Sequence, residues 1–448
     1  MNTGDVTMNR IIKLMFIYLI LSTAVSAQTY DLDTYLELVE KNSHDLKIVE
    51  KQLEMADAIA KEAWATALPK ISATGKYNRN FLESKLFVDM TNPETGESMT
   101  QEFKISRNNE WNFNAVLNQT LFSFQIGNAL TAARQYEQLS DFAYRSGYQK
   151  IMSAAKKLFY QTLLLKTVAE VADTSENNAR ANYENMKQKF NQGLISEFEL
   201  LQAEVNWKNE IPKVTQSVRN YQLLLANLKM FAGIPSADEI QLQGDLETHP
   251  EMPDKEGLDS VLAVRPDYLA LDWERKLRET GVRAEKSAYY PDLQGNLIFS
   301  YSSQSDAWKI NDNENKNIIG NLTLNIPIYL GGYVGAQVQK AKVDLDKTEI
   351  QLNKMKEEIE KDLNNIHLRL KEAEQRIKSA QSTLTTTKKA FHIAQVSADN
   401  GLITQLELKD ARLFNDQAQL NFYSAVYDYL DAYFDWELAI GRVTKTAW

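Results

Sequence analysis

The chain has 448 residues, of which 44% are hydrophobic and 25% charged, and its formal net charge at pH 7 is −10. This composition is typical of a folded protein and excludes an intrinsically disordered chain. Charges of both signs are interspersed without a basic stripe, which argues against nucleic acid as a partner.

The first residues have the pattern of a secretory signal peptide. Arg10 and Lys13 precede the apolar run LMFIYLIL, and the small residues 25–27 (VSA) form a cleavage pattern. A transmembrane anchor is the alternative, but this apolar run is much shorter than the ~20 residues that cross a bilayer. We therefore expect residues 1–27 to be a signal peptide and the chain to be exported.

The remaining composition limits the chemistry of the mature chain. The sequence contains no cysteine, so we expect neither a disulfide framework nor a lipid attached to cysteine. The histidines are His44, His249, His367 and His392, and they form no metal-binding spacing. We predict no metal, no cofactor and no catalytic site. No second apolar run suits a membrane-spanning helix, so a membrane role would have to use strands.

An internal repeat indicates two halves of similar architecture. NQGLISEFELLQAE, from Asn191, matches DNGLITQLELKDAR, from Asp399, and LNQTLFSFQIGNAL, from Leu117, matches LNIPIYLGGYVGAQ, from Leu324. We predict a first repeat over residues 28–232, a linker over 233–256, a second repeat over 257–440 and a C-terminal tail over 441–448.

Each half begins with a predicted helix, over roughly 35–69 and 258–290, that ends at a proline. A predicted strand pair follows, within 71–124 and 292–330. In the segment WNFNAVLN, the apolar residues Trp111, Phe113, Ala115 and Leu117 fall on one face, and the other face has Asn112, Asn114 and Asn118. This period of two predicts strands with one apolar and one polar face.

The segments between the paired strands, 80–110 and 304–317, are polar and rich in turn formers. We predict both to be exposed loops that project from the same edge of the sheet. Strands with an apolar outer face and a polar inner face are typical of outer-membrane barrels. Four strands cannot close a barrel, whereas three chains would supply twelve.

A very long helix follows the strands in each half, over about 128–192 and 334–400. From Val338 to Ile377, apolar or small residues recur mostly in alternating steps of three and four, which is the heptad pattern of coiled coils. A helix of this length spans roughly 100 Å. The sequence therefore predicts a mainly α fold of long antiparallel coiled-coil helices.

Each long helix ends in a predicted chain reversal. The turn residues are Gly193, Leu194, Ile195 and Ser196 in the first half, and Gly401, Leu402, Ile403 and Thr404 in the second. The glycines provide the positive φ that a helix C-terminus favours. Ser196 and Thr404 begin capping boxes with Glu199 and Glu407. We predict a tight helix hairpin at each turn.

The chain resembles the TolC family of outer-membrane efflux proteins. The resemblance covers essentially the whole mature chain and is carried by the duplicated layout, the Leu-Pro and Tyr-Pro helix ends, LNQTLFSF, LNIPIYLGG, and the paired GLIS and GLIT turns. It implies a homotrimer with a twelve-stranded barrel in the outer membrane of a Gram-negative bacterium, in contact with outer-membrane lipid. It also implies a helical barrel that extends into the periplasm.

The same resemblance implies function and partners. The expected function is a passive exit duct of a tripartite efflux or type I secretion system, and not an enzyme. The expected partners are a periplasmic adaptor (membrane fusion) protein, which would contact the two turns, and an inner-membrane transporter. A soluble periplasmic coiled-coil adaptor or scaffold, with the strands in a small sandwich, is the alternative.

Acidic residues after the second turn surround the narrowest part of the tunnel in this family. The pattern G-x(5)-acidic-x(2)-acidic falls on Gly401, Glu407 and Asp410, and the first half has Glu199 and Gln202 at the equivalent positions. The resemblance implies that these four residues form a gate or constriction. Crowded carboxylates attract cations and can act as an electrostatic filter. The alternative is that Glu407 only caps its helix and Asp410 is a solvated charge.

Overall fold

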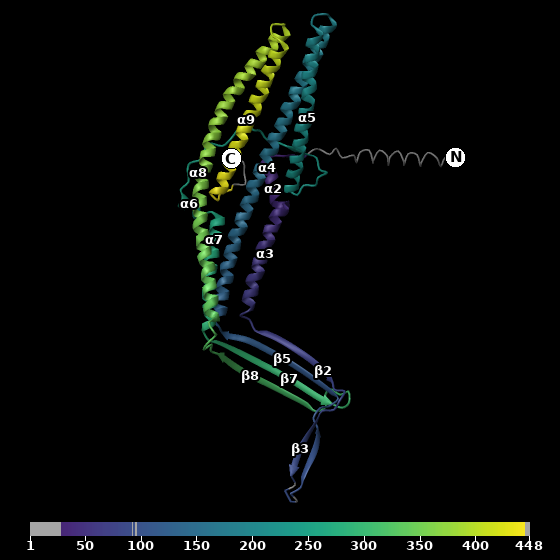
Figure 1. Ribbon diagram of the computed structural model, residues 1–448, viewed down its shortest axis with the longest axis vertical. Helices are drawn as coiled ribbons and strands as arrows, with labels where there is room; N and C mark the ends of the chain where they lie inside the picture. The colour runs from purple at the N-terminus through teal and green to yellow at the C-terminus, as the bar shows by residue number, and fades with distance from the viewer. Residues whose placement is uncertain (1–27, 92, 95, 444–448) are drawn as a thin grey trace, which may run out of the picture. The chain divides into compact units, whose positions relative to one another are not determined.

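A computed structural model of the chain describes residues 28–91, 93, 94 and 96–443 (Figure 1). The predicted signal peptide, residues 1–27, and the end of the predicted tail, residues 444–448, lie outside this range. The described residues form two compact units. Unit 1 comprises residues 28–53, 141–269 and 353–443, and unit 2 comprises residues 54–140 and 270–352.

Two long helix hairpins make up most of unit 1. The first consists of α4 (Phe124–Asn191) and α5 (Glu197–Phe231), and the second of α8 (Tyr333–Asp399) and α9 (Gln405–Ala439). Helices α4 and α8 each begin in unit 2. Helix α8 has 67 residues, so it is about 100 Å long. The prediction of a mainly helical fold with very long antiparallel helices is confirmed.

The core of unit 1 follows the predicted heptads. The buried residues of α8 in this core are Ile359, Leu363, Ile366, Leu370, Ala373 and Ile377. They recur in steps of three and four, because a helix of 3.6 residues per turn brings such positions to one face. Aromatic residues of α4 and α9 complete the core, with Tyr160 and Phe434 5.6 Å apart between ring centroids.

A pair of short parallel strands, which the sequence did not reveal, lies in unit 1. Strand β1 (Gln28–Tyr30) pairs with β6 (Ile240–Leu242), inside the predicted linker. Leu242 and Leu246 are each 2% exposed and belong to the core. Strands of three residues are too short for an alternating pattern to be recognised. The linker therefore packs against the core of unit 1.

A close approach of two backbone segments makes Gly233 sensitive to substitution. Its φ is +65°, and an added Cβ would lie 2.9 Å from the carbonyl oxygen of Asn42. We expect Gly233→Ala to destabilise the protein by more than the ~1–2 kcal/mol of left-handed strain alone. Gly193→Ala is the control, because φ there is +71° but the space is open. Equal thermal midpoints for the two variants would contradict this expectation.

The predicted helix over 35–69 is wrong in detail, because it consists of two helices. Helix α2 (Leu32–Asn42) ends at Ser43, whose extended ψ of 129° breaks the helix while its N–H donates to the Val39 carbonyl. Helix α3 (His44–Ala65) then ends before Pro69, and residues 66–68 form tighter i→i−3 hydrogen bonds.

The predicted helix over 258–290 is also divided. Helix α6 (Leu258–Leu262) is followed by α7 (Pro266–Lys286) and a 3₁₀ turn, η1 (Ser287–Tyr289). Pro266 is the first residue of α7, where the missing N–H has no helical partner to lose. The break therefore has a local cause in the sequence.

Unit 2 contains a four-stranded antiparallel sheet in the order β2–β5–β7–β8 (Figure 1). The strands are β2 (Lys70–Arg79), β5 (Asn109–Phe122), β7 (Asp292–Ser305) and β8 (Glu314–Asn325). Thr74, Asn114, Ser300 and Asn317 are paired across the sheet, as are their neighbours Ala73, Ala115, Phe299 and Ile318. Successive side chains point to opposite faces, so one face is polar and the other apolar. Among the described residues of the chain, β2 and β8 each have one unpaired edge.

The prediction that residues 80–110 form a loop is wrong. They contain a β-hairpin of β3 (Lys85–Thr91) and β4 (Ser98–Lys104). Its strands mix polar and apolar residues without strict alternation, and turn formers lie between them. The sequence pattern therefore did not predict the pairing. The second predicted loop, 304–317, is shorter than expected, because β7 extends to Ser305 and β8 begins at Glu314.

Aromatic clusters lie at both ends of the four-stranded sheet. Tyr77, Trp111 and Trp308 have ring centroids 5.0–5.6 Å apart at one end. Phe122, Phe124 and Tyr290 form the other cluster, with neighbouring centroids 4.9–5.0 Å apart. Trp111 and Phe122 are both in β5, so the clusters are separated by about 36 Å along the strand.

Candidate functional site

Both predicted turns are present at the ends of the long helices. Gly193 (φ 71°) follows α4 and Gly401 (φ 73°) follows α8. The N–H of Leu194 donates to the Lys189 carbonyl at 3.0 Å, and the N–H of Leu402 donates to the Ser397 carbonyl at 2.9 Å. This six-residue hydrogen bond across a left-handed glycine is the Schellman arrangement, which satisfies carbonyl groups at a helix end.

Each following helix begins with the predicted capping box. The N–H and hydroxyl of Ser196 donate to Glu199 Oε2 at 2.8 and 2.9 Å. The N–H and hydroxyl of Thr404 donate to Glu407 Oε2 at 2.7 and 2.9 Å. In return the N–H of each glutamate donates to the capping hydroxyl. The capping role predicted for Glu199 and Glu407 is confirmed.

Capping makes the second turn sensitive to acid. Hydrogen bonds from the Thr404 N–H and hydroxyl hold the pKa of Glu407 below its usual range. A carboxyl group whose pKa is lower in the folded state than in the unfolded state stabilises the turn fully at pH values above its unfolded-state pKa. This stabilisation is lost as the pH falls through the folded-state pKa. Intrinsic amide exchange is base-catalysed and slows as the pH falls, so the exchange rate is compared with the intrinsic rate at each pH. We expect the protection of the amides of Leu402–Leu408 to decrease on acidification. Glu407→Gln should remove this pH dependence, and an unchanged dependence would contradict it.

The four predicted gate residues are exposed near the start of α5 and α9. Gln202 lines an open groove of about 330 Å³, together with Phe198, Leu201, Val205, Asn206, Leu406 and Lys409. Glu199, Glu407 and Asp410 do not line this groove. Of the four residues, Gln202 is thus the one that lines this groove, opposite Leu406 and Lys409 of α9.

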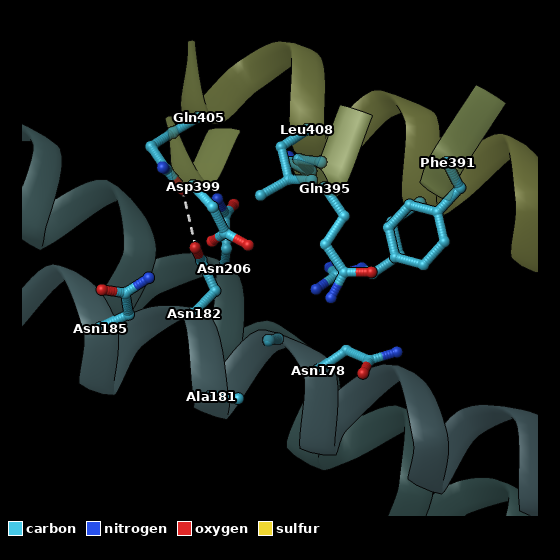
Figure 2. A pocket seen from close by; sticks show the side chains of 13 residues that line it. Asn178, Ala181, Asn182, Asn185, Asn206, Phe391, Gln395, Asp399, Gln405 and Leu408 are labelled. Carbon is cyan, nitrogen blue, oxygen red and sulfur yellow. Dashed lines mark hydrogen bonds between the residues drawn. The ribbon is translucent and has the colours of Figure 1, made fainter. Parts of the chain in front are cut away.

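A polar cavity lies between the two hairpins next to the turns (Figure 2). It has a volume of about 160 Å³ and receives Asn178 and Asn182 from α4, Asn206 from α5, Gln395 from α8 and Gln405 from α9. The amide of Asn182 donates to Gln405 Oε1 at 2.7 Å. The hairpins therefore meet through polar side chains here, whereas the core of unit 1 is apolar.

Sequence reasoning missed a buried ion pair that connects α5 with α9 beside this cavity. Arg412 Nη2 lies 3.2 Å from Glu210 Oε1, and both side chains are less than a tenth exposed. Glu210 also contacts Lys213 at 3.0 Å. The sequence feature that could have revealed this pair is the seven-residue spacing of Ala203, Glu210 and Ser217, which are buried in α5. A charged residue at such a heptad position lies in the core and requires a partner there.

Further charge lies one turn along α9 from Arg412. Burial raises the pKa of Asp416 above its ordinary value, although a hydrogen bond from Ser175 and the charge of Arg412 oppose this shift. Arg412 Nε has no hydrogen-bond partner among the described residues. The contact between the hairpins is therefore charged as well as polar near the turns.

Two kinds of feature are missing from the part of the chain that the structure describes. No helix there is long and apolar enough to cross a membrane. Nor does any group of three or more His, Cys, Asp or Glu residues within those limits have a geometry that could hold a metal ion.

Comparison with known proteins identifies the family. The model of the family described as outer membrane efflux protein matches residues 35–233 and 257–442. The chain belongs to this family. The resemblance to TolC-like proteins is thereby confirmed, and an outer membrane efflux protein is a channel rather than an enzyme. No curated protein sequence matches the chain.

Solved outer-membrane channels share the fold of this outer membrane efflux protein. The outer membrane channel CmeC of Campylobacter jejuni has a TM-score of 0.76 and 19% identity, over 92% of this chain and 85% of CmeC. VceC of Vibrio cholerae has a TM-score of 0.72 and 15% identity, over 92% and 96%. MtrE of Neisseria gonorrhoeae, solved in its open state, has a TM-score of 0.71 and 14% identity, over 92% and 89%.

Proposed function

We propose that this outer membrane efflux protein is the homotrimeric exit duct of a tripartite efflux or type I secretion system. The observation that carries the proposal is the open sheet of unit 2, in which β2 and β8 each have one edge that pairs with no other described segment. These edge strands have 10 and 12 residues, so β8 of a second copy can pair with nearly all of β2. Three copies would close a barrel of twelve strands, in which no edge is exposed.

The dimensions of the sheet support a membrane position for this barrel. The two aromatic clusters are about 36 Å apart along β5, and a strand tilted by ~40° would separate them by about 28 Å across the membrane. Outer-membrane barrels have an apolar band of ~25 Å between aromatic girdles. We infer that the apolar face of the sheet contacts outer-membrane lipid and that the polar face lines a wet interior.

The helix hairpins provide the periplasmic part in this proposal. We propose that the turns at Gly193–Ser196 and Gly401–Thr404 contact a periplasmic adaptor, and that an inner-membrane transporter supplies the substrate. Exposed apolar side chains support a protein contact, since Leu194 is 67% and Leu402 77% exposed. We propose that residues 28–232 and 257–440 are two structural repeats joined by 233–256. The two segments matched by the family model support this division.

We also propose that Glu407 and Asp410, with Glu199 and Gln202, surround the duct at its periplasmic end. Glu407→Gln with Asp410→Asn removes the charge but keeps the capping box, because glutamine also serves at that position. We expect this variant to reduce the cation preference of the channel in a planar bilayer several-fold. The control is Glu197→Gln, another exposed acid in the first turn of α5. Unchanged conductance and selectivity would leave Glu407 as a helix cap only.

Cell fractionation separates this function from a soluble periplasmic adaptor or scaffold. We expect the protein in the outer-membrane fraction, soluble only with detergent, with a native mass of three chains. Recovery as a monomer in the periplasmic fraction without detergent would overturn the duct. The same preparation allows the adaptor contact to be tested by cross-linking at the two turns.

A further inference from the structure

The polar face of the sheet carries an uneven distribution of charge. The register places four rows of residues on this face: Lys70, Asn118, Asn296 and Asn321; Ser72, Val116, Ile298 and Ile319; Thr74, Asn114, Ser300 and Asn317; Lys76, Asn112, Ser302 and Asn315. Of these sixteen residues, only Lys70 and Lys76 are charged. Both are in β2, and both are exposed.

The acidic residues of the same face lie beyond these four rows. Glu110 is two residues past Asn112 in β5 and accepts a hydrogen bond from Asn80 at 2.8 Å. Asp292, at the other end of the sheet, accepts one from Asn325 at 3.1 Å. Neither lysine forms an ion pair with any residue in the described parts of the chain, so the middle of the polar face carries a net positive charge.

Closure of the barrel would not neutralise this charge. The edge strand β8, which would lie next to β2 of the next copy, presents asparagines and Ile319 on the polar face. Its charged residues, Glu314 and Lys316, are on the opposite face and form an ion pair with each other at 3.1 Å. Three copies would therefore place six lysines on one interior wall.

We propose that Lys70 and Lys76 make the interior of the barrel electropositive, so that it favours anionic solutes over cations of similar size. This inference rests on the proposed function, since it requires the polar face to line the duct. It assigns opposite charge preferences to the two ends of the channel. The carboxylates near the second helix turn would favour cations, whereas the barrel wall would favour anions.

The size of the barrel makes this preference effective. Twelve strands spaced about 4.8 Å apart and tilted by ~40° form a barrel with a radius of about 12 Å. The four-carbon stem of lysine places its ammonium roughly halfway to the axis. Solutes in the interior would therefore pass within about one Debye length of the ammonium groups, which is ~8 Å at physiological ionic strength. The effect should weaken as salt is added.

Single cysteines allow the local potential to be measured, because the chain has no cysteine of its own. Ser72→Cys lies between the two lysines on the polar face, and Ala73→Cys lies on the opposite face. The measurement is the ratio of labelling rates by an anionic and a cationic methanethiosulfonate reagent of similar size, on protein in outer membranes. The ratio at Ser72→Cys is compared with and without Lys70→Gln and Lys76→Gln. The control is Lys316→Gln, which removes a lysine from the opposite face.

We expect Ser72→Cys to react and Ala73→Cys to remain unlabelled by both reagents. Removal of both lysines should lower the anionic-to-cationic ratio by about three- to tenfold at low salt, and Lys316→Gln should leave it unchanged. An unchanged ratio in the double lysine variant would overturn this inference and leave the duct intact. Labelling of Ala73→Cys as fast as Ser72→Cys, or no labelling of Ser72→Cys, would overturn the face assignment and with it the proposed function.

Discussion

Replacement of Glu437 by alanine is expected to destabilise unit 1 by about 3–5 kcal/mol, since it removes one partner of a buried ion pair. Lys156 Nζ lies 2.8 Å from Glu437 Oε2, and the side chains are 1% and 5% exposed. The ammonium also lies 5.3 Å from the ring centroid of Phe434. Without the carboxylate, the charge of Lys156 would remain in the apolar core that joins α4 to α9.

Two further variants test whether the expected loss of stability arises from the burial of the ion pair. Asp428 is on α9, as Glu437 is, and pairs with Arg376 of α8. Asp428→Ala breaks this pair, but the side chains of Asp428 and Arg376 are 48% and 47% exposed. A surface pair of this kind contributes ~1 kcal/mol or less. Lys156→Met with Glu437→Leu replaces both charges by apolar groups and should recover much of the loss. Equal urea midpoints for Glu437→Ala and Asp428→Ala would contradict the assigned role of the pair.

Replacement of Arg412 by methionine is expected to loosen the two hairpins where they meet beside the turns. Methionine keeps much of the side-chain volume but removes the ion pair with Glu210, so α5 and α9 lose their buried charged contact. A change of about 1.4–3 kcal/mol in local opening would raise amide exchange by roughly ten- to a hundredfold. We expect this rise in the segments around Asn182 and Gln405, and a larger conductance of the channel in a bilayer.

Lys213 provides a matched control for Arg412. It contacts the same carboxylate of Glu210, but its side chain is 57% exposed. Lys213→Met should therefore leave exchange and conductance nearly unchanged. If Lys213→Met had the same effect as Arg412→Met, the buried position of Arg412 would not explain the contact. Unchanged exchange in Arg412→Met would show that the polar cavity, and not the ion pair, holds the hairpins together.

The helices and turns were predictable because their causes are local. The apolar positions of α8 repeat over many turns, and burial of Leu370 and its heptad neighbours follows from that period. The capping boxes at Ser196 and Thr404 are formed by residues three positions apart. Such signals survive in a single sequence because each can be checked without knowledge of the remainder of the fold.

The features that escaped prediction depend on distant or very short segments. Strands β1 and β6 each have three residues and are separated by more than two hundred positions. The pair of Glu210 with Arg412 joins residues 202 positions apart. The break at Ser43 has no proline or glycine to announce it, and the hairpin β3–β4 lacks clean alternation. In each case packing between segments determines the structure, and the local sequence pattern indicates it only weakly.

Local structure explains one of the two roles considered for Glu407. Its carboxylate caps α9, so its position after Gly401 is explained by the turn alone. A ring of carboxylates at the end of the duct is a further proposal about an assembly of three chains, and Asp410, which takes no part in the capping box, distinguishes the two roles. Charge removal that preserves the cap therefore tests the gate without disturbing the turn.

Ion conductance of the purified, detergent-extracted protein in a planar bilayer tests whether the protein is a trimeric exit duct. We expect discrete current steps from particles with the mass of three chains, since closure of the sheet requires three copies. Trimeric particles that insert into the bilayer without conducting, or current from particles with the mass of a single chain, would contradict the exit duct.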